Sequence, residues 1–134
     1  MTEQWTRWEP ISGLTLKYNI DIVSENAEKF EMILSGYTDA TNKVRVLFEN
    51  SVCAYRSADE TYRYKLIVDL TEAYGKDFYG DWTFFTVNNS SYLRWLSEES
   101  YGTSDERQLK HFSFIGADLI VDIADPSEPR VEFI

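Results

Sequence analysis

Alternation of apolar and polar residues is the sequence feature that most limits how this chain can fold. Between residues 14 and 22, leucine, tyrosine and isoleucine occupy every even position and polar residues every odd one. This period of two is typical of a strand with one buried face. It returns at 43–49, while 30–34 and 52–56 are short apolar segments close by. We therefore expect a series of neighbouring antiparallel strands with one face in solvent.

A helical pattern follows these strands. Ser57 and Glu60 have the spacing of a capping box, apolar residues then recur at helical intervals, and Gly75 can end the helix. These signals favour a helix at about 58–74. A strand remains an alternative there, because apolar residues between 62 and 70 also occupy every second position.

The densest aromatic block lies between Phe78 and Trp95. We interpret it as the junction of a buried strand at 82–87 with a second helix at about 90–100, for which Ser90 is an N-cap candidate. The expected structural aromatic core consists of Trp82, Phe84, Tyr92 and Trp95. The alternative is an aromatic pocket that stacks on a sugar or base. Trp5 and Trp8 either close one end of the core or form an exposed patch.

Further strands are expected at 109–115, 119–123 and 131–134. Strands on either side of two helices predict an α+β fold, a mostly antiparallel sheet with both helices packed on one face. The length of 134 residues suits one domain, 1–134. The single cysteine and the absence of an apolar N-terminal or membrane-spanning stretch lead us to expect a cytoplasmic protein.

The chain is acidic, with 23 Asp and Glu against 13 Lys and Arg and a formal charge of -10. This balance argues against partners that are nucleic acids or anionic membranes, which attract basic proteins. A basic protein partner is expected instead, although acidity can also serve solubility alone. The candidate partner-binding residues are local acids and helix-end acids: Asp69, Glu72, Asp77, Asp81, Glu98 and Glu99.

Residues typical of catalysis, metal binding or phosphate binding do not cluster in the sequence. One histidine and one cysteine cannot form the usual zinc site, and the glycines form no phosphate-binding loop. Asp118 and Asp122 have a spacing that would place both on one solvent-facing side of a strand. His111 is interpreted as a strand histidine that hydrogen-bonds a neighbour. We therefore name no catalytic, cofactor-binding or metal-binding residue and expect no cofactor.

Part of the chain, from about Tyr55 to the C-terminus, resembles small acidic bacterial proteins encoded near polymorphic toxins, which are treated as immunity proteins. The segments that carry the resemblance are 81–97, Ser100-Tyr101, 110–112, 121–123 and Glu128-Pro129. The resemblance implies stoichiometric inhibition by a domain that covers a toxin's active site. It implies no particular interface residue.

The leading hypothesis is a non-catalytic, immunity-type inhibitor that covers a basic toxin, for example a nuclease, through an acidic surface. One alternative is a small hydrolase or ligand-binding domain that uses an aromatic pocket near His111. A second alternative is a homo-oligomeric structural protein that pairs through the edge strand at 131–134.

Overall fold

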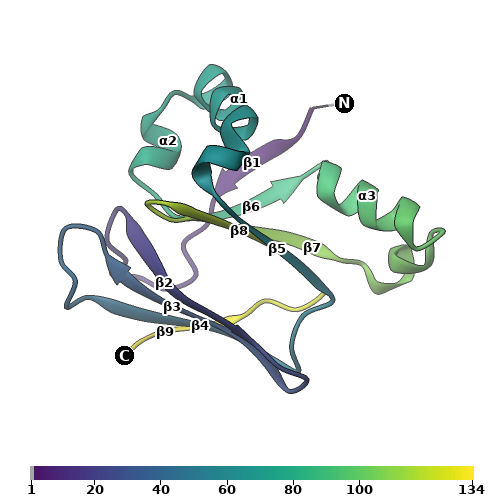
Figure 1. The fold of residues 1–134 in the computed structure, drawn as a ribbon, viewed down its shortest axis with the longest axis horizontal. Helices are drawn as coiled ribbons and strands as arrows, with labels where there is room; N and C mark the ends of the chain where they lie inside the picture. The colour runs from purple at the N-terminus through teal and green to yellow at the C-terminus, as the bar shows by residue number, and fades with distance from the viewer. Residues whose placement is uncertain (1) are drawn as a thin grey trace.

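Two antiparallel sheets form the framework of the computed structural model, which describes residues 2–134 (Figure 1). The first sheet has the strand order β1-β6-β7-β8-β5 and the second has the order β2-β3-β4-β9. The strands are β1 Gln4–Arg7, β2 Tyr18–Glu25, β3 Lys29–Gly36, β4 Lys43–Glu49, β5 Ala54–Asp59, β6 Phe84–Asn88, β7 Lys110–Ile115, β8 Leu119–Asp125 and β9 Arg130–Phe133.

The helices all lie on the first sheet's side of the molecule (Figure 1). They are α1 Tyr64–Tyr74, α2 Asp77–Gly80 and α3 Ser91–Glu99, with 3₁₀ turns η1 Glu60–Arg63 and η2 Thr103–Arg107. The predicted α+β class and antiparallel pairing are confirmed. The strands, however, are divided between two sheets. The sequence does not predict this division, because period-two alternation identifies a strand without identifying its neighbours.

Apolar side chains fill the space between the sheets. Phe30, Met32 and Val46 of the second sheet pack against Phe112 and Ile123 of the first. The outer face of the first sheet carries a smaller core, in which Phe85 and Ile120 pack with Leu70 of α1. The first sheet is therefore covered on both faces, and this explains why β7 and β8 are buried at almost every position.

The first helix begins later than the sequence predicts. Ser57 belongs to β5, so the predicted capping box does not form; Asp59 instead accepts a hydrogen bond from the Thr61 amide at 2.9 Å and caps η1. The sheet takes this segment because Ser57 and Ala58 pair with Val121 and Ile120 on β8. Gly75, with a φ of 84°, ends α1 as expected.

The tryptophans differ in their environments. Trp5 lies on β1, a strand that the sequence pattern did not indicate, and is buried; Trp8 packs against the inter-sheet core. Trp95, expected in the core, is 53% exposed. Tyr92 is the residue of α3 that is buried, and Trp95, three residues further along the helix, stacks on its ring with the centroids 6.2 Å apart.

The first alternating segment is only partly a strand. The paired region starts at Tyr18, whereas Leu16 precedes it and is 63% exposed.

The other three expected core aromatics pack inside: Phe84 and Tyr92 are buried, and Trp82 contacts both cores. Among the described residues, none of the helices combines the length and apolar character needed to cross a bilayer.

Candidate functional site

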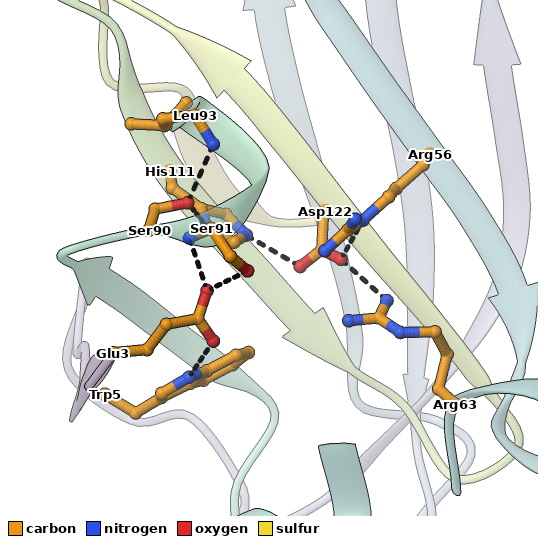
Figure 2. A network of polar contacts seen from close by, with 9 residues as sticks. All are labelled: Glu3, Trp5, Arg56, Arg63, Ser90, Ser91, Leu93, His111 and Asp122. Atoms are coloured by element: carbon orange, nitrogen blue, oxygen red, sulfur yellow. Dashed lines mark hydrogen bonds and ion pairs between the residues drawn. The ribbon is translucent and has the colours of Figure 1, made fainter. Parts of the chain in front are cut away.

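A continuous chain of polar contacts crosses the outer face of the first sheet (Figure 2). It runs from Ser90, at the start of α3, through His111 on β7 to Asp122 on β8, and ends at Arg56 and Arg63. These residues come from five elements or their junctions. The chain is therefore a product of the folded structure.

Ser90 is placed by the turn between β6 and α3. Asn89 adopts a left-handed conformation with a φ of 53°, which asparagine tolerates better than most residues. The turn sets the Ser90 hydroxyl over the first turn of α3, where its oxygen accepts a hydrogen bond from the Leu93 amide at 3.0 Å. The same oxygen lies 2.7 Å from Nδ1 of His111. Ser90 is thus a helix cap and a partner of the imidazole at once.

Asp122 is the centre of the network. Its Oδ1 lies 2.8 Å from His111 Nε2, and its Oδ2 accepts hydrogen bonds from Arg56 Nε at 2.8 Å and Arg63 Nη1 at 2.7 Å. Burial alone would raise the pKa of Asp122. The hydrogen bond from His111 and the charges of Arg63 and Arg56 outweigh burial and hold this pKa well below its usual range.

Aromatic rings enclose the imidazole. Trp5 and Tyr92 meet the His111 ring edge-on, with centroids 6.1 and 5.5 Å away. The Arg56 guanidinium lies 4.2 Å from the centroid of the Tyr92 ring, on the side of the network that reaches solvent. Burial raises the pKa of Tyr92 from 10.0 to about 12, further above physiological pH, at which a tyrosine hydroxyl is already neutral.

The distances within Ser90–His111–Asp122 match those of a nucleophile, a base and an orienting acid. Three features differ from a working triad. His111 presents Nδ1 to the serine and Nε2 to the acid, the reverse of the arrangement in serine proteases. Ser90 is buried and already accepts the Leu93 amide. Two arginines also neutralise Asp122, which weakens its ability to stabilise an imidazolium.

A cavity of about 400 Å³ adjoins His111 between β7 and the β6–α3 turn. Ser90 and His111 both line it, together with Asn88, Lys110 and Glu128. Val87, Leu93 and Leu109 line it as well, so the cavity near His111 is mixed polar and apolar, while Trp5 and Tyr92 pack on the imidazole ring itself.

A second cavity, of about 560 Å³, lies between β1 and α1, and we call it the β1–α1 groove. Two of the candidate partner-binding acids, Asp69 and Glu72, line it. A third acid, Glu3, joins them from the chain segment just before β1. The structure thus brings together acids that are distant in the sequence.

Glu3 is anchored by neutral donors. Its Oε2 accepts hydrogen bonds from the amide and hydroxyl of Ser91 at 2.8 and 2.7 Å, and its Oε1 accepts one from the indole of Trp5 at 3.3 Å (Figure 2). Burial would raise the pKa of Glu3, but these hydrogen bonds lower it below its usual value. Glu3 therefore lines the groove as a carboxylate.

The other nominated acids lie apart from the groove lining. Asp77 begins α2 and Asp81 follows it, and both are exposed. Glu98 and Glu99 are exposed at the end of α3, which Figure 1 shows separated from α1 and α2. The expected pair of Asp118 and Asp122 does not form: Asp118 lies in the exposed turn before β8, whereas Asp122 is buried.

Lys17 is a partly buried cation at a third cavity, of about 360 Å³. Its ammonium donates to the carbonyl oxygens of Tyr79, Ile115 and Trp82 at 2.5, 2.6 and 3.0 Å. Burial lowers the pKa of Lys17 to about 8, against the opposing charges of Glu60 and Asp81. The three carbonyls account for all three donors of the ammonium, so Lys17 joins the first sheet to the α2 segment.

Sequence signals for these sites were uneven. A charged residue inside the apolar run of β8 was a usable signal that Asp122 is buried and paired. Glu3, Arg56 and Arg63 carried no local signal, because tertiary contacts alone define their partners. Within residues 2–134, no three histidine, cysteine or acidic side chains gather closely enough to hold a metal ion.

Comparison of the chain with protein-family models, with curated proteins and with solved structures finds no match.

Proposed function

We propose that this protein is a non-catalytic binding protein of the bacterial cytoplasm, an immunity-type inhibitor that covers a basic toxin through acidic surface. The observation that carries the proposal is the β1–α1 groove, where Glu3, Asp69 and Glu72 line a single cavity. Acids gathered at a cavity offer a basic partner both shape and charge, which scattered acids do not.

The net charge of -10 supports the same proposal through the kinetics of encounter. A field of one sign attracts an oppositely charged partner from a distance and raises the association rate. At an ionic strength of 0.1 M, salt screens this attraction at separations beyond about 10 Å. Association with the partner is therefore expected to slow steeply as salt is added.

The burial and the internal pairing of Ser90, His111 and Asp122 also favour a binding function over a catalytic one. Ser90 and His111 are buried, and the carboxylate of Asp122 is held by two arginines. This arrangement suits a polar contact that fixes α3, η1 and β5 on the sheet. A rigid framework lowers the entropy cost of binding a partner.

Co-expression with the product of a neighbouring toxin gene tests the proposal. We expect the chain to suppress toxicity and to elute with the toxin as one complex on gel filtration. The Asp69→Lys/Glu72→Lys double variant should weaken the complex, while Glu98→Lys/Glu99→Lys, with the same change in net charge, serves as the control. A toxin that stays fully lethal and elutes alone would refute the proposal.

A small hydrolase is the second candidate, favoured by the cavity that Ser90 and His111 share. In that function Ser90 would act as nucleophile and His111 as base, as their 2.7 Å separation permits. Hydrolysis of p-nitrophenyl acetate tests it, with Ser90→Ala compared with Ser91→Ala, whose hydroxyl contacts Glu3 instead. Turnover above the buffer rate that only Ser90→Ala abolishes would support the hydrolase, and equal rates in both variants would exclude it.

A further inference from the structure

We infer that the β1–α1 groove receives an arginine side chain presented by the protein partner, an inference that rests on the proposed binding function. The groove has an apolar floor, formed by Trp5 of β1 with Leu66 and Leu70 of α1. The acidic residues Glu3, Asp69 and Glu72 also line the groove. An arginine has the matching construction, since an apolar stem carries a cationic head.

The side chains that line the groove carry an excess of negative charge, which can attract a cation from a partner. Asp69 is already paired with Lys65, at 2.9 Å. Glu3 and Glu72 form no ion pair with any side chain of residues 2–134. The lining also holds the Lys65 ammonium, whose pKa is raised by Asp69 and, more weakly, by Glu3. Three carboxylates against one ammonium leave the lining with a net charge of -2, so one guanidinium placed there would lie in a favourable field.

Glu3 retains capacity for one more donor. A carboxylate has about four acceptor positions, and the Glu3 side chain uses two on Oε2 and one on Oε1. The remaining position on Oε1 is available to an N–H group. The hydrogen bonds from Ser91 and Trp5 hold the carboxylate in place, so little side-chain entropy is lost when a ligand binds.

Arginine fits this lining better than lysine. Its guanidinium is planar, weakly hydrated and able to pack on aromatic rings, whereas an ammonium is compact and strongly hydrated. Tyr74, which is 40% exposed, is the accessible ring of the lining, whereas Trp5 is only 6% exposed. The Tyr74 hydroxyl accepts a hydrogen bond from the Trp5 amide at 3.0 Å, which fixes the distance between α1 and β1.

Titration of the isotope-labelled full chain with the peptide Ac-Gly-Arg-Gly-NH2 tests the inference by NMR. The indole N–H of Trp5 is the reporter, because it donates to Glu3. We expect saturable shifts of this resonance and of the Ser91 amide. The citrulline peptide, equal in shape but uncharged, should shift neither, and the lysine peptide should bind several-fold more weakly than the arginine peptide. Equal responses to arginine and citrulline would overturn the inference, and equal affinities for arginine and lysine would overturn the choice of arginine.

Variants then locate the peptide. Glu72 is exposed and makes no described ion pair, so Glu72→Gln should fold normally and weaken arginine binding roughly two- to fivefold. Glu98→Gln removes the same charge from α3 and should leave the affinity unchanged. Equal weakening by both substitutions would show a general charge effect and overturn the groove as the site.

The toxin complex separates this inference from the proposed function. Loss of toxin affinity with Glu72→Gln, but not with Glu98→Gln, supports the groove. A stable toxin complex that neither substitution affects would overturn the groove while the inhibitor function stands. Failure to form any toxin complex would instead refute the proposed function, whatever the peptide result.

Discussion

His111 on β7 and Asp122 on β8 are joined by a 2.8 Å contact between Nε2 and Oδ1, on a sheet face where both side chains are buried. The two residues are diagonal neighbours, since Asp122 pairs directly with Ser113 and His111 with Ala124. A buried carboxylate persists only when its charge is compensated. Here compensation comes from η1 and β5, so this contact connects the sheet to the segment that leads into α1.

Replacement of Asp122 by Asn should destabilise the fold strongly. The substitution leaves Arg56 and Arg63 without their carboxylate, and breaking a buried ion pair from one side typically costs about 3 kcal/mol. Urea unfolding followed by tryptophan fluorescence measures the change. The control is Asp118→Asn in the exposed turn before β8, which should change stability by less than about 0.5 kcal/mol.

The contribution of Asp122 should also depend on pH. Because its pKa is lower in the folded chain than the unfolded value near 3.8, the unfolded chain binds more protons below that pH, and the free energy of unfolding falls. The difference between wild type and Asp122→Asn should therefore be about 1 kcal/mol smaller at pH 3 than at pH 7. A difference that stays constant with pH would show that the carboxylate keeps an ordinary pKa.

Much of the strand content followed from the sequence, because half-buried strands show period-two alternation and buried strands show short apolar segments. The segments at 30–34, 43–49 and 109–115 lie within or across β3, β4 and β7. The cap at Ser90 was equally local, since its hydroxyl bonds an amide three residues ahead. Features that depend on a few adjacent residues were therefore predictable.

The division into two sheets and the polar network were not predictable in this way. Ser57 could cap a helix or extend β5, and only pairing with Val121 on β8 decides between them. Glu3 contacts Ser91, which is 88 residues away in the sequence. The sequence identifies Asp69 and Glu72 by their charge alone, whereas the packing of α1 beside β1 brings them together with Glu3 around the groove.

Lys17 should titrate far from the ordinary lysine range. Burial lowers its pKa to about 8, whereas the unfolded value is 10.5. The unfolded chain therefore binds more protons between these pH values, and the Lys17 contribution to the free energy of unfolding rises with pH across that window, by at most about 1.4 kcal/mol per pH unit. The NMR shift of the Lys17 Cε carbon should show a midpoint near pH 8.

Two variants check this assignment through stability. The stability of wild type relative to Lys17→Met should increase between pH 8 and 10.5. The exposed-site variant Lys76→Met serves as the control for the loss of one ammonium. A Cε midpoint near 10.5 would contradict the assignment. It would mean that the three carbonyls stabilise the ammonium enough to offset its burial.

Two buried serines, Ser90 before α3 and Ser113 on β7, should change stability in opposite directions when replaced by alanine. Ser90 caps α3 and contacts His111, so Ser90→Ala should cost about 1 kcal/mol. Ser113 Oγ is buried without a hydrogen-bond partner among residues 2–134. Removing an unsatisfied hydroxyl relieves a desolvation cost, so Ser113→Ala should stabilise the fold by about 0.5–1 kcal/mol. Thermal and urea unfolding of both variants give the two signs, and a loss of stability in Ser113→Ala would mean that the hydroxyl has a partner such as an ordered water.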